Sequence, residues 1–183
     1  MKREHYSTPS YVSWDAMFMG VALLAACRSK DPKSRNGACI VSIEHRILGV
    51  GYNGLPRGCD DRDPIFWSDD DGDPFRSKHS YVVHAELNAI LNCVALPLNG
   101  ARIYATQFPC PRCAQAIIQI GIQDVVFLSQ KPHHERQNLA ATKMFASGGV
   151  AVREVSSLDA NTAIWLGKLS DVLEDLVPRT TER

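Results

Sequence analysis

Two short motifs contain the residue types that could do chemistry. His84-Ala-Glu86 sets an imidazole two residues before a carboxylate, and Cys110-Pro-Arg-Cys113 follows Pro109 and sets two thiols three residues apart. Side chains three apart lie on one face of a helical turn, so both sulfurs can bind one ion. Together with His84 they form a ligand set that zinc prefers. We therefore predict one zinc ion per chain with its fourth position open to water, which is typical of catalytic zinc.

Glu86 is the predicted proton carrier of this site. Two thiolates cancel the charge of Zn²⁺, so a water molecule on the metal needs a base beside it. Glu86 lies outside the ligand set and is predicted to take that proton and pass it to a leaving amine. His-x-Glu followed by Pro-Cys-x-x-Cys is already known as the signature of zinc deaminases that act on nucleobases. Because the cysteines begin a predicted helix, we also expect the helix dipole to lower the pKa of both thiols.

Two other interpretations of the zinc motifs stay open. A purely structural zinc would need a fourth protein ligand, which Cys59 or His79 could supply. A binding module stabilised by zinc would show no turnover at all. An acidic run, 69–73, could hold a different cation, but the calcium-loop pattern needs Gly and Glu where this chain has Pro74 and Ser80. A solvated acidic loop is the simpler interpretation, and Mg²⁺ bound together with a nucleotide triphosphate is the one cation that we keep open there.

The predicted elements place both motifs at the starts of helices. After residue 80 the chain alternates between helix and strand, which favours a largely parallel sheet covered on both faces. The predicted strands are 37–43 and 47–52, which form a hairpin, and 102–106, 124–128 and 150–155; the predicted helices are 14–25, 84–94, 110–121, 135–147 and 158–177. We expect an α/β fold, a three-layer α/β/α sandwich on a five-stranded mixed sheet. A single domain, 1–183, would have its core at about 13–155 and a helical tail at 156–183.

Several stretches resemble those of deoxycytidylate (dCMP) deaminases, a family within the cytidine deaminase-like zinc superfamily. They are His84-Ala-Glu-Leu-Asn-Ala-Ile90, Phe108-Pro-Cys-Pro-Arg-Cys-Ala114, Arg28-Ser-Lys-Asp-Pro32, Gly37-Ala-Cys-Ile40 and Gly51-Tyr-Asn-Gly-Leu-Pro56. The zinc motifs are common to the superfamily, whereas the Gly-Tyr-Asn-Gly-x-Pro stretch points to dCMP. The resemblance implies hydrolysis of dCMP to dUMP, which supplies the precursor of thymidylate.

The resemblance also implies roles for individual residues. Zinc would be held by His84, Cys110 and Cys113, and Glu86 would protonate N3 and the departing ammonia. The implied substrate-binding residues are Asn53 at the sugar hydroxyl, Arg28 and Ser29 in a turn suited to phosphate, Ala85, and Phe108, which either stacks on the pyrimidine or packs in the core. An effector site would include Gly51, Tyr52, Asn53 and Gly54. The family further implies a homohexamer that dCTP activates and dTTP inhibits.

Composition favours a small-molecule substrate. Lys and Arg together number 20, as do Asp and Glu, and the pI is near 7.0, so no basic surface is expected to gather nucleic acid. A deaminase that edits tRNA or single-stranded DNA is therefore the less favoured alternative, while a preference for C5-modified dCMP depends on pocket shape and stays open. No apolar stretch approaches the ~20 residues that span a bilayer, and no secretory signal is visible. We expect a cytoplasmic enzyme without a membrane partner.

Overall fold

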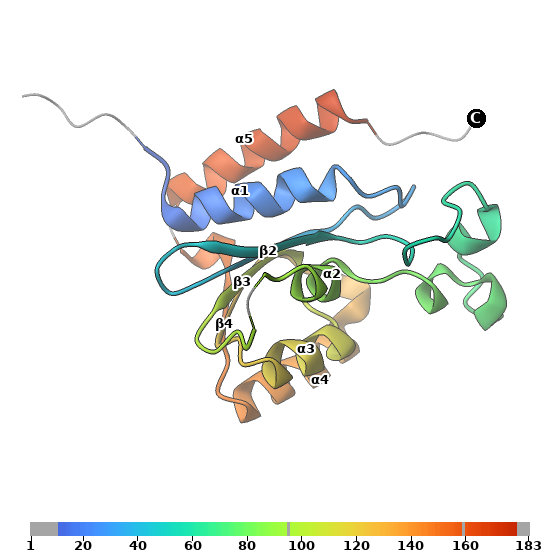
Figure 1. Ribbon diagram of the computed structural model, residues 1–183. Coiled ribbons are helices and arrows are strands. Elements are labelled where there is room, and N and C mark those ends of the chain that lie inside the picture. The colour runs from blue at the N-terminus through green and yellow to red at the C-terminus, as the bar shows by residue number, and fades with distance from the viewer. Residues whose placement is uncertain (1–10, 95, 159, 179–183) are drawn as a thin grey trace, which may run out of the picture.

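The computed structural model describes residues 11–94, 96–158 and 160–178, and its centre is one five-stranded sheet (Figure 1). The strands are β1 (Gly37–Val41), β2 (Ile47–Tyr52), β3 (Arg102–Gln107), β4 (Asp124–Ser129) and β5 (Ala151–Glu154). They lie in the order β2-β1-β3-β4-β5. Strand β1 is antiparallel to both of its neighbours, whereas β3, β4 and β5 run parallel. The predicted mixed sheet is confirmed.

Helices cover both faces of this sheet. They are α1 (Trp14–Ala26), α2 (Ala85–Leu91), α3 (Pro111–Gln119), α4 (Glu135–Ser147) and α5 (Ala160–Leu176), with short 3₁₀ turns η1 (Pro64–Trp67), η2 (Pro74–Arg76), η3 (Lys78–Ser80), η4 (Pro132–His134) and η5 (Val155–Ser157). Figure 1 shows α1 and α5 on one side of the sheet and α2, α3 and α4 on the other. Each side has its own apolar core. The predicted three-layer α/β/α sandwich is therefore confirmed.

The first and last helices pack against each other. Ser13 caps α1, as predicted, by accepting a hydrogen bond from the Ala16 amide at 3.1 Å. The Ser13 hydroxyl also lies 2.7 Å from the Thr162 hydroxyl in α5, and Leu166 of α5 is fully buried against the α1 side of the sheet. The predicted helical tail is thus part of the core, a question that its sequence left open.

Several predicted ends differ from the observed ones. The first strand ends at Val41 rather than at 43, because Ser42 begins the hairpin turn and its amide donates to the Arg46 carbonyl. The helix that starts at Ala85 ends at Leu91 rather than at 94. The irregular segment between β2 and α2 contains η1 and η2, each of which starts with Pro after a capping Asp. Residues 1–10 and 179–183, at the ends of the predicted domain, lie outside the described residues.

One edge of the sheet gathers the starts and ends of several elements. Because β1 is antiparallel to β2 and β3, Asn36 before β1, Asn53 after β2 and Phe108 after β3 all lie at the same edge. The parallel strand β4 also ends there, next to Lys131. Open α/β sheets bind ligands at the carboxyl ends of their parallel strands. Among the described residues, no helix is both long and apolar enough to cross a membrane.

Candidate active site

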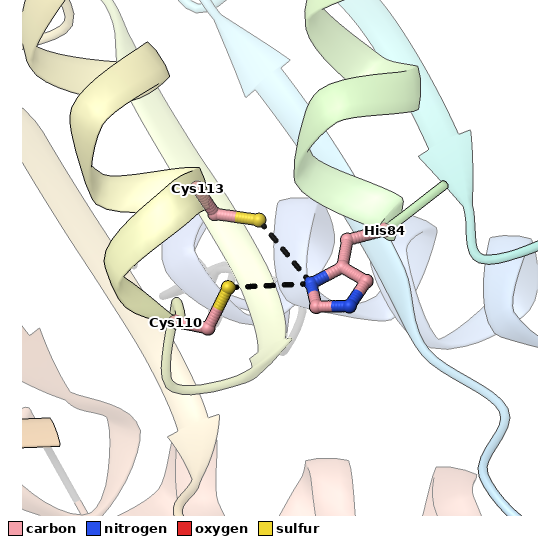
Figure 2. Close-up of side chains that lie close together, drawn as sticks. All are labelled: His84, Cys110 and Cys113. Carbon is pink, nitrogen blue, oxygen red and sulfur yellow. Dashed lines mark hydrogen bonds between the residues drawn. The ribbon is translucent and has the colours of Figure 1, made fainter. Parts of the chain in front are cut away.

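Three side chains of the two sequence motifs converge at the sheet edge (Figure 2). The Nδ1 atom of His84 lies 3.4 Å from the Cys110 sulfur and 3.5 Å from the Cys113 sulfur. The ligand atoms of these residues all lie within 4.8 Å of one another. The motifs are 26 residues apart, so the fold, and not the chain alone, brings them together.

The local backbone turns these side chains toward one another. His84 is the N-cap of α2 and Cys110 is the N-cap of α3, and both have extended backbone angles. Neither side chain makes the hydrogen bond to the helix backbone that a Ser or Asp cap would make. Pro111 occupies the first turn of α3, where its missing N–H costs nothing. Both caps therefore keep their ligand atoms available at the edge.

The spacing of the donor atoms fits a tetrahedral zinc ion. Bond lengths of about 2.3 Å to sulfur and about 2.05 Å to nitrogen, at tetrahedral angles, set sulfur and nitrogen ligands about 3.6 Å apart. The observed separations of 3.4 and 3.5 Å are close to that value. Cys59 and His79 were the candidates for a fourth protein ligand. Among the described residues, neither belongs to this group. Its three members leave one corner of a tetrahedron without a protein ligand.

The two cysteine thiols of this group differ in acidity. A hydrogen bond from the Cys113 thiol, together with the contact to His84, lowers the pKa of Cys110 to about 3. Donating that hydrogen bond and being buried raise the pKa of Cys113 above its usual value. The expectation that both pKa values are lowered is met only at Cys110, because one proton shared between two sulfurs stays with the more buried one. The contact with Cys110 raises the pKa of His84.

Glu86 lies in the first turn of α2, two residues beyond His84, and is 6% exposed. Burial raises the pKa of its carboxyl group, and the neighbouring His84 opposes that shift. The carboxylate is not one of the three grouped ligands. A buried carboxyl beside a metal site, but outside the ligand set, has the placement that a proton carrier requires.

The residues implied for the sugar and phosphate are placed differently from one another. Asn53 is buried at the edge, and its side chain is held by three hydrogen bonds within the protein. Ser29 is also buried, and its hydroxyl donates to the Asn53 carbonyl at 2.8 Å. Arg28 is exposed just after α1, and Lys30 pairs with Asp61. The Ser29 hydroxyl therefore already donates a hydrogen bond within the protein, to the backbone of Asn53.

The remaining candidates lie at contacts between elements. Ala85 is buried at the start of α2, and a Cβ on Gly51 would lie 2.4 Å from its carbonyl oxygen, so Gly51 lets β2 approach the helix closely. The Tyr52 carbonyl accepts a hydrogen bond from the Asn88 side chain. Of the two options for Phe108, core packing is the contact observed: its ring meets Phe127 edge to face with centroids 5.0 Å apart. Gly54 pairs with Val83 in an isolated bridge.

The acidic run is paired within the protein. Asp69 contacts Lys33 and lies 3.7 Å from the Lys78 ammonium, and Asp71 accepts a hydrogen bond from Ser77 at 2.8 Å. His79 lies 3.9 Å from Asp71. This segment thus forms an ion-paired loop on the edge of the site.

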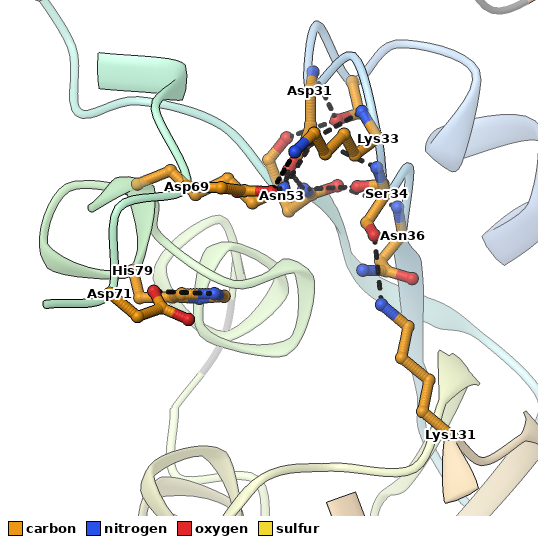
Figure 3. Close-up of polar contacts among 11 residues, drawn as sticks. Asp31, Lys33, Ser34, Asn36, Asn53, Asp69, Asp71, His79 and Lys131 are labelled. Carbon is orange, nitrogen blue, oxygen red and sulfur yellow. Dashed lines mark hydrogen bonds and ion pairs between the residues drawn. The ribbon is translucent and has the colours of Figure 1, made fainter. Parts of the chain in front are cut away.

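Some residues at the edge were not among the predicted site residues. Figure 3 shows Asp31, Ser34 and Asn53 linked by hydrogen bonds, with Lys131 reaching Ser34 from the far side of the edge at 3.0 Å. Asp31 stands 22 residues before Asn53 in the chain. Periodicity and motif spacing act over a few residues, so the sequence offered no signal that would have connected them.

Comparison with known proteins identifies relatives of this chain. Residues 12–129 match the family model for the cytidine and deoxycytidylate deaminase zinc-binding region. A deoxycytidylate deaminase of Mus musculus is 46% identical over 144 residues, covering 79% of this chain and 80% of the relative. ComE operon protein 2 of Bacillus subtilis is 36% identical over 149 residues, covering 79% of this chain and 72% of that protein.

A solved structure shares the fold. The dCMP deaminase of cyanophage S-TIM5, in complex with dCMP and dUMP, superposes with a TM-score of 0.59 at 24% identity, covering 80% of this chain and 99% of that one. The family model includes the candidate ligands His84, Cys110 and Cys113 as well as Glu86. The match extends from the start of α1 to the end of β4, so it covers the elements that build the site. The chain belongs to the cytidine and deoxycytidylate deaminase family.

Proposed function

We propose that this protein is a zinc-dependent hydrolase that converts dCMP and water to dUMP and ammonia. One observation carries the proposal: His84 Nδ1 meets two cysteine sulfurs at 3.4 and 3.5 Å, with the buried Glu86 two residues away in the chain. Similarity to a deoxycytidylate deaminase at 46% identity over most of the chain supports dCMP as the substrate.

His84, Cys110 and Cys113 would hold the zinc ion. When bound, zinc supplies the Lewis acidity that makes water nucleophilic near neutral pH. The bound ion would link the start of α2 to the start of α3, because His84 and Cys110 are the N-caps of these helices and Cys113 lies in the first turn of α3. Cys113 is buried and His84 and Cys110 are partly buried, which would limit the access of bulk water to the reacting carbon, C4 of the pyrimidine.

Glu86 would carry the proton between the reacting groups. It would accept one proton from the attacking water and deliver it to N3 of the ring, and would then take the remaining proton of the new hydroxyl group at C4 and deliver it to the departing amine. The carbon–oxygen bond forms and the carbon–nitrogen bond breaks at C4, so ammonia leaves as the oxygen is retained. Because Glu86 is buried, its proton exchanges with the substrate rather than with solvent.

Other residues at the edge would bind the nucleotide. Asn53 uses one lone pair of its carbonyl oxygen within the protein, and the second lone pair would accept a hydrogen bond from the sugar hydroxyl. Arg28 would contact the phosphate, with Ser29 holding Asn53 beneath it. Ala85 would line the base pocket, and Phe108, which is partly buried, would close it.

The family relationship supports a regulated assembly. We propose a homohexamer that responds to dCTP and dTTP through an effector site including Gly51, Tyr52, Asn53 and Gly54. The acidic run that starts at Asp69 would take part when a triphosphate binds with Mg²⁺. The reaction would feed thymidylate synthesis from the free cytoplasmic nucleotide pool.

A substrate panel tests this function. The zinc-loaded protein is assayed by absorbance with dCMP, CMP, deoxycytidine, 5-methyl-dCMP and a cytosine-containing oligonucleotide, with and without dCTP. We expect turnover of dCMP above the other substrates, and its loss on chelation with recovery on adding zinc. Turnover of the oligonucleotide alone, falling steeply with added salt, would instead identify a nucleic-acid editing enzyme. No turnover of any substrate by zinc-loaded protein would favour a binding module.

A further inference from the structure

A buried ion pair joins the irregular segment to the loop before β1. Lys78 and Asp31 are 7% and 2% exposed, and the Lys78 ammonium lies 3.0 and 3.1 Å from the two carboxylate oxygens. The two residues are 47 positions apart. Together with Glu86 they are the charged side chains that are buried among the described residues. Lys78 stands six positions before His84, so the pair ties the segment that leads into α2 to a different part of the fold.

A buried ion pair needs further hydrogen bonds to offset its desolvation, and Asp31 has them. Its Oδ1 atom accepts from the Lys33 and Ser34 amides at 2.9 and 3.0 Å. Its Oδ2 atom accepts from the Asn53 side-chain amide at 3.2 Å. Both oxygens are therefore acceptors at once, which a carboxylate can provide and a carboxamide cannot.

These contacts determine which way the Asn53 amide points (Figure 3). Its Nδ2 donates to Asp31 and to the Ser34 carbonyl, the latter at 2.8 Å, while its Oδ1 accepts from the Asn36 amide at 2.7 Å. Reversing the amide would bring its NH₂ group against the Asn36 N–H. The negative charge of Asp31 thus holds the side-chain oxygen of Asn53, Oδ1, toward the start of β1.

Asn53 lies beside the candidate metal site. Gly54 and Val83 form an antiparallel bridge, with N–H to O=C distances of 3.1 and 2.9 Å in the two directions. Asn53 precedes Gly54 and His84 follows Val83, so each of them is one residue from this bridge. The bridge therefore connects the backbone at Asn53 with the backbone at the residue that would bind the metal.

We propose that Lys78 is a positioning residue for nucleotide binding: through Asp31 it holds the Asn53 amide in the orientation that receives the substrate beside His84. The inference rests on the proposed function for its kinetic readout. Lys78 contacts neither the candidate ligands nor Glu86 directly, so it acts on binding through Asn53 rather than on the chemical step.

The test compares two lysine substitutions. Lys78→Met removes the buried charge, and Lys33→Met is the matched control. Lys33 lies in the loop that contains Asp31 and pairs through Asp69 with the segment that contains Lys78, but its side chain is 61% exposed. We expect Lys78→Met to raise the KM for dCMP about tenfold while kcat changes little and zinc stays at one per chain. Lys33→Met should change KM by less than about twofold. Equal KM values for the two variants would overturn the proposal.

A double variant separates positioning from stability. Lys78→Met alone leaves Asp31 buried and unpaired, which lowers Tm. Asp31→Asn/Lys78→Met removes both charges, so Tm should recover, but an amide at 31 cannot accept on both sides and the raised KM should persist. If KM recovered together with Tm, Lys78 would serve only the stability of the fold.

A measurement that does not depend on activity distinguishes failure of the positioning role of Lys78 from failure of the proposed function. The side-chain NH₂ of Asn53, assigned from its absence in Asn53→Ala, should exchange slowly with solvent in the parent and in Lys33→Met, and faster in Lys78→Met. Slow exchange in Lys78→Met would contradict the positioning role even if dCMP is a substrate. Absence of dCMP turnover in the parent would contradict the proposed function, while the exchange rates would still test the orientation of Asn53.

Discussion

At the scale of single residues, members of one sequence motif differ in acidity because they differ in burial and in their contacts. Cys110 and Cys113 occupy one motif, yet the pKa of Cys110 is lowered to about 3 and that of Cys113 is raised, because the Cys113 thiol keeps its proton and donates a hydrogen bond to the Cys110 sulfur. His84 and Glu86 also occupy one motif, but only His84 belongs to the ligand group with the two sulfurs, whereas the Glu86 carboxyl group contacts the Cys113 thiol from outside that group. Glu86 stays nearby with a carboxyl group that burial makes a weaker acid.

Glu86→Gln tests this division of roles. The variant keeps the size and burial of the side chain but cannot carry a proton. We expect zinc to stay at one per chain and dCMP turnover to fall by about 10²–10⁴-fold. Metal analysis and the absorbance assay measure the two quantities. Glu44→Gln, an exposed change in the hairpin turn, should leave both unchanged. If Glu86→Gln lost its zinc, Glu86 would be a ligand and its proposed role would be wrong.

At the scale of elements, the position of α2 depends on how closely β2 approaches it. A Cβ on Gly51 would lie 2.2 Å from the Ala89 nitrogen and 2.4 Å from the Ala85 oxygen, both of which are helix backbone. Backbone atoms cannot rotate away as a flexible side chain can. The glycine therefore sets the distance between the hairpin and the helix that follows His84.

Gly51→Ala should push α2 away from the sheet. We expect the free energy of unfolding to fall by about 1–3 kcal/mol, as for other overpacked sites, and dCMP turnover to fall with it. Urea unfolding measures the first quantity. Gly167→Ala is the matched control, since a Cβ at this position in α5 meets no atom within 4 Å. Alanine favours helix over glycine by up to about 1 kcal/mol, so the control should be unchanged or more stable. Equal stability of the two variants would show that β2 can shift to make room.

At the scale of the whole molecule, two ionisable groups are buried next to each other in the middle of the sheet. Cys39 in β1 pairs in register with Tyr104 in β3, and both are fully buried. Burial raises the pKa of Cys39 to about 12. Burial, followed by the hydrogen bond to Asp15, also raises the pKa of Tyr104. Both groups are neutral when protonated, so the folded state keeps protons that the unfolded chain releases.

Stability should therefore fall at alkaline pH. The unfolded chain loses its cysteine proton above about pH 8.5 and its tyrosine proton above about pH 10. The free energy of unfolding should be level near neutral pH for these groups. It should then decrease by about 1.4 kcal/mol per pH unit from about pH 8.5 for Cys39, and by about 1.4 kcal/mol per pH unit more from about pH 10 for Tyr104. Urea unfolding between pH 7 and 11 measures this slope.

Cys39→Ala identifies the source of the slope. In this variant the slope that begins near about pH 8.5 should become smaller by about 1.4 kcal/mol per pH unit, the share of Cys39. The shares of Cys93 and Cys113, whose pKa values are also raised, and the part that begins near about pH 10 and belongs to Tyr104 should remain. Cys59→Ala, at a partly exposed thiol in the irregular segment, should retain both parts. A free energy of unfolding that stayed level up to pH 11 in the parent would show that Cys39 and Tyr104 ionise as readily in the folded protein as in the unfolded chain.

Sequence alone determined the elements and the reactive residues. Strand β2 and helix α4 have the predicted bounds, because alternation and helical periodicity are local properties of the chain. The fold class followed from the order of these elements. His84, Glu86, Cys110 and Cys113 could be selected because each motif is short and stands at the start of a predicted helix.

Tertiary structure alone decided how those residues are held. The contact between Lys78 and Asp31 spans 47 residues, and the contact between Asp31 and Asn53 spans 22, distances over which no periodic pattern operates. The packing of α5 on α1 and the unequal acidity of the two thiols likewise depend on what surrounds each group in space. Burial and hydrogen bonding are set by neighbours in three dimensions, and here most of those neighbours are distant in the chain.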